Sequence, residues 1–319
     1  MIDFRYHIVS IVAIFLALTI GIVVGTTALN GPVLDDLRGR VSVQARDKRT
    51  LEGQVRALQG QVGSDQTFVS AVAPLLVTGR LAGQRVVVIS APGASDAIRD
   101  GVVNELRLAG AQVSARVKIR GDYVAPDKAA ALDDLVSRLA PAGIALTGAT
   151  VGERAGAELA AALVGTADRR GSLSNDAATT VLAGFQAAGL LTVEGDPPTM
   201  GTLGVAIVGP APDKATPADT EAVKALLALV GAMDARSGGA VLAGPREAAS
   251  GGGAIAALRA DAKLSANVST VDGADSAIGA VATVFSLRGQ LRGESGQYGT
   301  GPGASAPLPV PTVSPSAGT

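Results

Sequence analysis

The chain opens with a long run of apolar residues. Residues 8–29 contain no charged side chain, and only serine and threonine hydroxyls interrupt the apolar pattern. About 20 apolar residues are enough to cross the hydrocarbon layer of a membrane as a helix. The apolar core of a secretory signal is usually shorter and ends at a small-x-small cleavage site, which Thr26-Thr27-Ala28 matches poorly. The pattern therefore predicts a transmembrane helix over residues 8–29, with a cleaved signal or a buried core helix as the alternatives.

The charges that flank this run bear on its orientation in a membrane. Residues 1–7 form a short N-terminal segment with Arg5 and His7, whereas residues 38–49 carry more lysines and arginines. A count of these charges alone places the second flank in the cytoplasm, but a large folded domain is translocated largely regardless of charge. We therefore expect a single-pass protein in the cell membrane, with a cytoplasmic N-terminus and an extracytoplasmic C-terminal domain.

A second apolar pattern, with alternating spacings of three and four residues, occupies residues 33–76. Its apolar positions are Leu34, Leu37, Val41, Leu51, Val55, Leu58 and Val62. This spacing is the a/d repeat of a coiled coil, in which polar residues such as Gln44 and Lys48 lower stability and can determine the register. Several glycines weaken the helix further, but a membrane tether raises the local concentration of two copies. The pattern predicts a coiled-coil stalk that forms a homodimer, and a lone amphipathic helix packed on the following domain is the alternative.

Two further features of the N-terminal part affect how its helices run and meet. Gly21 and Gly25 are four residues apart, a spacing that lets two membrane helices approach closely. Glycine is common in this chain, so composition alone explains the spacing equally well. Pro32 lacks the backbone donor that a helix interior needs, and we expect it to break or bend the chain.

From residue 84 to residue 291, short apolar runs alternate with longer amphipathic stretches. We expect strands at 85–90, 112–119, 190–195, 203–209, 240–244 and 264–272. We expect helices at 94–109, 126–139, 151–163, 177–188, 217–235, 253–259 and 276–291. Strands that alternate with helices imply a mainly parallel sheet with helices on both faces. The sequence therefore predicts an α/β domain over residues 84–291, Rossmann-like or flavodoxin-like.

The last part of the chain has a different composition. Residues 293–319 are rich in glycine, serine, proline and threonine. Such a segment buries too little apolar surface to fold, so we expect a disordered or polyproline-like tail.

Composition narrows the functions open to the domain. The chain of 319 residues has 27 basic and 28 acidic side chains, a balance that argues against a nucleic-acid partner. It has no cysteine, which excludes disulfides, thiolate metal sites and cysteine catalysis. Its single histidine precedes the apolar run, so the domain cannot contain a Ser-His-Asp triad. We expect a protein that is not an enzyme, with an enzyme that uses a lysine base or a carboxylate pair as the alternative.

Turns that follow strands at the carboxyl edge of such a sheet are the usual ligand sites. The turn after the first strand could present helix-terminal N–H groups to an anion, with Gly93, Ser95 and Asp96 as the candidate residues. A second glycine-rich turn follows the strand at 240–244. Neither turn matches the dinucleotide-binding or P-loop pattern, so a purely structural turn is the alternative for both.

Possible metal ligands are few. Thioethers suit Cu(I) and imidazole suits Cu(II), which makes His7, Met200 and Met233 the candidates. Met200 falls in an expected loop, and Met233 falls on an expected helix, where a role in core packing is the alternative.

Two stretches of the sequence resemble a known family. FRYHIVSIVAIFLALTIGIVVGTT (4–27) and STVDGADSAIGAVATVFSLRGQLRGESGQYGTGPGA (269–304) are similar to the two ends of the actinobacterial MctB-like family, whose name refers to copper transport and the outer membrane. The resemblance extends to about residue 303 and implies a cell-envelope protein of copper export or homeostasis. A related branch of the family implies a membrane-anchored partner in an envelope complex for cell separation, where it influences peptidoglycan hydrolysis.

Three functions are therefore open. The first is a role in copper export or homeostasis, with copper implied by the resemblance alone. The second is a dimeric scaffold without catalytic activity, which regulates peptidoglycan remodelling through an envelope or cell-division partner. The third is a sensor of an anion or a small ligand. Short apolar strands separated by helices differ from the long alternating strands of outer-membrane proteins, so the sequence itself favours the cell membrane over the outer membrane.

Overall fold

The computed structural model describes residues 4–140, 148–166, 172–194 and 200–309, and for residues 4 and 27–38 it describes the backbone only. The contacts divide the chain into two compact units, residues 1–65 and 66–319. The second unit is a mixed, mostly parallel seven-stranded sheet with helices on both faces. This confirms the predicted α/β class.

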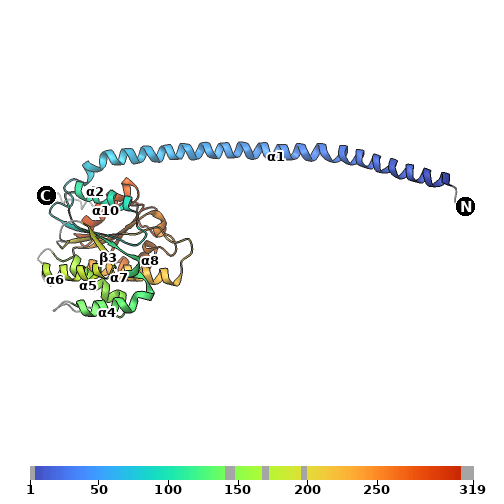
Figure 1. Ribbon diagram of the computed structural model, residues 1–319. Helices are drawn as coiled ribbons and strands as arrows, with labels where there is room; N and C mark the ends of the chain where they lie inside the picture. Colours follow the sequence, from blue (N-terminus) through green and yellow to red (C-terminus); the bar gives the residue numbers. More distant parts are fainter. Residues whose placement is uncertain (1–3, 141–147, 167–171, 195–199, 310–319) are drawn as a thin grey trace. The chain divides into compact units, whose positions relative to one another are not determined.

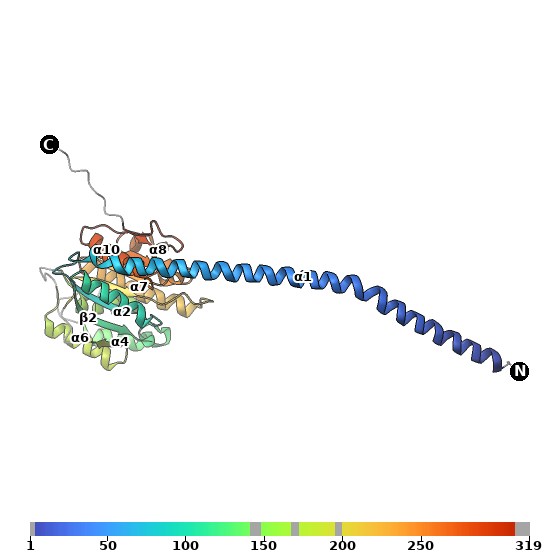
Figure 2. The ribbon, with the colours of Figure 1, turned by 90° about the horizontal axis from the view of Figure 1, so that it is seen from above.

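The N-terminal part is a single helix, α1 (Phe4–Val77), which the structure continues through Pro32 without a break (Figure 1). The expected break at Pro32 is therefore absent, because a proline within a long helix removes only one backbone hydrogen bond. The alternative expectation was a bend, and Figure 2 shows α1 changing direction within its blue N-terminal part. In the apolar part of α1, the hydroxyls of Thr19 and Thr26 donate to the carbonyls of Phe15 and Ile22 four residues earlier. Hydroxyls bonded in this way are compatible with an apolar environment.

The last turns of α1 belong to the core of the second unit. Ala73 and Val77 are buried with Leu81 in one of its two apolar clusters. The heptad pattern was expected to form a stalk as far as residue 76. The last turn of that stretch packs on residues that follow it, and the stalk over residues 33–76 stays a prediction.

The sheet has the strand order β3-β2-β1-β4-β5-β6-β7. Its strands are β1 (Arg85–Ser90), β2 (Gln112–Ile119), β3 (Leu191–Glu194), β4 (Leu203–Ile207), β5 (Ala240–Gly244), β6 (Ser269–Asp272) and β7 (Gln297–Tyr298). All neighbours pair in parallel except β2 and β3, which are antiparallel. The chain moves outward in one direction after β1 and in the other after β4, which places a reversal of strand order between them.

Helices cover both faces of the sheet (Figure 1). The helices are α2 (Asp96–Leu108), α3 (Gly121–Val124), α4 (Ala129–Leu139), α5 (Val151–Leu163), α6 (Asn175–Ala187), α7 (Pro217–Arg236), α8 (Ala254–Ala260), α9 (Ala262–Ser265) and α10 (Ala277–Gln290), and 3-10 turns span Pro126–Lys128 and Arg246–Ala249. α2 and α10 pack together on one face, and α5 and α7 pack together on the other. α4 and α6 lie toward one edge of the sheet and α8 toward the other (Figure 2). Each face has its own apolar cluster.

One expected strand is partly a helix. Residues 264–272 were expected to be extended, but α9 occupies the start of this stretch and β6 only its end. Asp261 explains the difference, because its carboxylate accepts the backbone N–H groups of Lys263 at 2.9 Å and Leu264 at 3.0 Å. This is an N-cap, and it starts a helical turn where apolarity alone indicated a strand.

The expected disorder from residue 293 is corrected as far as residue 309. β7 extends the sheet by pairing with β6, and the chain beyond it is bonded to the domain. The later residues of the expected tail, 310–319, lie outside the described residues.

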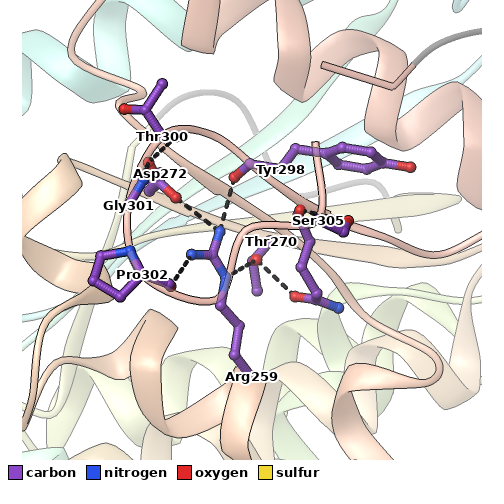
Figure 3. Close-up of polar contacts among 9 residues, drawn as sticks. Arg259, Thr270, Asp272, Tyr298, Thr300, Gly301, Pro302 and Ser305 are labelled. Carbon is purple, nitrogen blue, oxygen red and sulfur yellow. Dashed lines mark hydrogen bonds and ion pairs between the residues drawn. The ribbon is translucent and has the colours of Figure 1, made fainter. Parts of the chain in front are cut away.

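A buried ion pair holds this C-terminal strap, residues 297–305 (Figure 3). The guanidinium of Arg259 donates to Asp272 at 2.8 Å, to the carbonyl of Tyr298 at 2.8 Å and to the carbonyl of Pro302 at 2.7 Å. The other carboxylate oxygen of Asp272 accepts the N–H groups of Thr300 and Gly301, each at 2.8 Å. Only 5% of the Arg259 side chain and none of the Asp272 side chain is exposed. The strap has little apolar surface, and the hydrogen bonds from this buried ion pair hold its backbone on the domain.

Candidate functional site

A crevice lies at the carboxyl edge of the sheet, where strands β1, β4, β5 and β6 end. It has a volume of about 700 Å³ and lies beside the first turns of α2 and α10. The reversal of strand order between β1 and β4 is at this edge, and such a position is the usual ligand site of open α/β sheets. The two turns singled out from the sequence meet here, because Ser95 and Glu247 line the same crevice.

The lining of the crevice is acidic. It includes Glu105, Glu247 and Asp275 and no lysine or arginine. Burial raises the pKa of Glu105, and its Oε2 atom is buried without a hydrogen-bond partner. The crevice therefore offers acceptors to a cation or a hydroxyl-rich ligand more readily than donors to an anion.

The structure places the three residues of the predicted anion site in different surroundings, and the site itself stays a prediction. Ser95 lines the crevice and caps α2 without a side-chain hydrogen bond to the helix. Gly93 adopts a φ of +78°. Its carbonyl oxygen lies close to Gly209, and a β-carbon placed on Gly209 would lie 2.5 Å from that oxygen. Asp96 is absent from the lining and pairs with Arg99 at 2.9 Å and Lys118 at 3.3 Å. The chain turn after β1 thus shapes the crevice, while Asp96 takes part in a surface ion-pair network.

The predicted metal candidates are not assembled into a site. Met200 and Met233 are buried in the apolar cluster beneath the sheet, and His7 is exposed on α1. Across the residues that the structure describes, no group of three or more His, Cys, Asp or Glu side chains could hold a metal ion. Both methionines pack in the core of the domain, and their role as metal ligands stays a prediction.

The heptad seam of α1 is exposed along the first unit. Val41, Leu51, Val55, Leu58 and Val62 are each at least half exposed, and the side chains of Leu34 and Leu37 lie outside the described residues. A β-carbon placed at Gly21 or Gly25 would meet open space. An apolar seam of this length on one helix is the kind of surface that pairs with another helix.

The comparison with protein families covers both units. Residues 1–309 match the family described as "Copper transport outer membrane protein, MctB". The chain belongs to the MctB family. A "Copper transporter MctB" of Mycobacterium tuberculosis is 32% identical over 313 residues, which is 95% of this chain and 98% of that protein. The "Copper transporter MctB" of Mycobacterium leprae is 30% identical over 323 residues, 96% and 98% of the two chains.

Within this MctB-family chain, the stretch 269–304 that carried the resemblance forms one structural assembly. It contains β6, α10 and most of the strap that Arg259 binds in Figure 3. Gly299, in this stretch, has a φ of +127°, and a β-carbon there would lie 2.2 Å from the carboxyl carbon of Asp272. The glycines of the ending are thus needed where the backbone wraps around a buried carboxylate.

Glu158 and Tyr123 form a buried polar pair that was not predicted from the sequence. Glu158 of α5 and Tyr123 of α3 are 0% and 2% exposed, and neither the Glu158 carboxyl oxygens nor the Tyr123 hydroxyl has a hydrogen-bond partner. Burial raises the pKa of Glu158 to about 7. Burial, and secondarily the charge of Glu158, raise the pKa of Tyr123. A single acid in the otherwise apolar run AGAELAAAL was the available signal, whereas the proximity of Tyr123 arises only from the fold.

Proposed function

We propose that the protein is a membrane-anchored cell-envelope protein that contributes to copper export or homeostasis. The observation that carries this proposal is similarity over 95% of the chain to proteins named copper transporters. The proposed role is non-catalytic, which is supported by the absence of histidine and cysteine from the sequence of the domain. Copper in this proposal is cargo or signal, and it is not a resident cofactor.

The proposed location is the cell membrane, crossed once. Support comes from the 22 residues Arg5–Thr26, which form a helical stretch long and apolar enough to cross a membrane. The short N-terminal segment stays readily in the cytoplasm, while the α/β domain lies outside the membrane on the other side. A cleaved signal would leave the same domain free in the envelope, and the intact mass of the mature protein distinguishes the two.

A second candidate function is a dimeric scaffold that regulates peptidoglycan remodelling and cell separation. The observation that favours it is the exposed seam of α1, with valine at the a positions Val41, Val55 and Val62 and leucine at the d positions Leu51 and Leu58. Within parallel coiled coils, valine at a and leucine at d favour two helices over three or four. A parallel pair suits two copies anchored in one membrane, and it would present two identical domains to an envelope or cell-division partner.

A gene-deletion strain separates these functions. If the copper proposal is right, the strain should grow poorly at copper concentrations that the parent tolerates, and its cells should separate normally. Re-expression of the full chain should restore copper tolerance. Normal copper tolerance combined with chained, unseparated cells would contradict the first proposal and favour the scaffold.

A further inference from the structure

The crevice at the carboxyl edge of the sheet is elongated. Its lining follows α2 on one side, and the stretch from Ala97 to Glu105 is about 12 Å long at the rise of an α-helix. The other side is formed by the turn after β6 and the start of α10. Most of the lining residues are small or apolar, including Ile98, Ala277 and Ala280. The crevice can therefore hold a thin, extended ligand with an apolar body.

Three carboxyl groups line this crevice, those of Glu105, Glu247 and Asp275, and its described lining has no lysine or arginine. Among the described residues, none of the three takes part in an ion pair or a side-chain hydrogen bond. Glu247 and Asp275 are exposed, and Glu105 is partly exposed with only its Oε2 atom buried, so an occupant can reach all three side chains. A cleft lined by charges of one sign attracts ligands of the opposite charge, so the crevice favours a cation.

Gly101 leaves free space in the same lining. It lies inside α2, where a glycine weakens the helix. A β-carbon placed at Gly101 would have no atom within 4 Å, so packing within the described domain does not require a glycine there. The missing side chain leaves room for an occupant to lie against the backbone of α2. Gly101 is also a position at which a larger side chain can be introduced without a clash at its β-carbon.

The arrangement of the carboxyl groups points to an organic cation. In the described part of the chain, no three acidic or histidine side chains are close enough together to hold one metal ion, so these carboxyl groups are separated. An ammonium group needs fewer partners, because it carries its own three hydrogen-bond donors. A linear polyamine has several ammonium groups, which its methylene chains hold apart. We propose that the crevice binds a linear aliphatic polyamine, whose ammonium groups pair with Glu105, Glu247 and Asp275 and whose methylene chains lie against the apolar lining beside Gly101.

The test compares probes of similar length that differ in charge. The full chain in a neutral maltoside detergent is titrated calorimetrically with spermidine, 1,8-octanediol and magnesium chloride. Spermidine should bind saturably, one molecule per chain, with a Kd on the order of 100 μM. Higher salt should weaken this binding, because exposed charges are screened. The diol and magnesium should each bind at least tenfold more weakly than spermidine.

Two independent variants and a matched control locate the site. Glu105→Gln combined with Asp275→Asn removes two carboxylates from the lining and should weaken spermidine binding at least tenfold. Gly101→Leu fills the crevice without changing its charge and should weaken binding by at least as much. Asp127→Asn combined with Asp176→Asn removes two exposed carboxylates outside the lining and should leave the affinity unchanged.

Circular dichroism melting shows whether each variant is folded. The proposal is overturned if spermidine does not saturate, or if the diol or magnesium binds as tightly as spermidine. It is also overturned if Gly101→Leu is folded and binds spermidine like the parent protein, or if the control pair weakens binding as much as the crevice pair.

Discussion

Glu158 has an environment that is unusual for a carboxyl group, because it is fully buried in α5 and no described side chain pairs with it. Single residues of this kind can be noticed in a sequence as an acid within an apolar run. Whether the acid faces solvent or the core depends on neighbouring elements, here α3 and α4, whose contacts are formed between residues distant in the chain. The local pattern accordingly indicates Ser95 as a candidate in the turn after the first strand, but it does not indicate Glu158 or Tyr123.

The pH dependence of stability tests the state of Glu158. Its pKa is raised from 4.5 to about 7 in the folded protein, so the folded state binds more protons than the unfolded state between these values. The free energy of unfolding should therefore fall as the pH rises through this window, by about 3 kcal/mol in total. Glu158→Gln has no proton to lose and should remove most of this dependence. Urea unfolding at pH 4 and pH 8 measures the difference.

Glu247→Gln is the matched control for this measurement, because Glu247 is exposed. That variant should retain the pH dependence of the parent protein. If the free energy of unfolding of Glu158→Gln falls with rising pH as steeply as that of the parent protein, Glu158 does not cause the dependence. Its carboxylate would then be ionised and hydrated in the folded state.

The position of the C-terminal strap depends on one side chain, that of Arg259. Residues 293–309 have the composition of a disordered tail, yet β7 pairs with β6 and the strap carries the hydrogen bonds of Arg259 and Asp272. The composition of this segment correctly indicates little apolar surface. It does not indicate that two buried side chains, Arg259 and Asp272, form hydrogen bonds with the backbone of the strap. This is why local reasoning assigned disorder to an ordered element.

Replacement of Arg259 tests the strap directly. Arg259→Met leaves Asp272 buried without its cation and should lower the free energy of unfolding by about 3 kcal/mol. It should also speed amide exchange at Thr300 and Gly301, whose N–H groups bond to Asp272. Hydrogen-exchange mass spectrometry of the C-terminal peptides measures this effect.

Arg292→Met provides the comparison, because Arg292 pairs with Glu294 at the surface. An exposed pair contributes about 0–1 kcal/mol, so this variant should have near-parental stability and exchange. Equal effects of the two substitutions would contradict the role assigned to Arg259.

The seam of α1 is the element on which dimerisation depends. Leu51→Glu combined with Leu58→Glu places like charges at two d positions and should shift a dimer to monomers. Thr50→Glu adds a charge at a c position, on the side of the helix away from the seam, and should leave the dimer intact. Cross-linking in membranes and light scattering in mild detergent measure the two outcomes. A dimer that survives the double substitution would mean that α1 does not hold the two copies together through its heptads.

At the scale of the whole molecule, the chain belongs to the MctB family, yet its described residues contain no group of three or more His, Cys, Asp or Glu side chains that could hold a metal ion. Met200 and Met233 lie in the apolar core, so their thioethers are shielded from solvent copper. We expect the full chain to bind Cu(I) only weakly, and Met200→Leu and Met233→Leu to leave that binding unchanged. Competition with a chromophoric Cu(I) chelator measures the affinity. A tight stoichiometric site that either substitution removes would contradict this reading of the core.

The sequence by itself determined the features that depend on local pattern. Apolar runs and their spacing identified the N-terminal helix, the heptads and most strands and helices, because burial on one face imposes a period on the chain. Only the tertiary structure decided which of these elements meet. The crevice between strand ends, the strap around Asp272 and the buried pair of Glu158 and Tyr123 all join residues far apart in sequence. Such sites arise from packing between elements, and the periodicity of a single element carries no record of its neighbours.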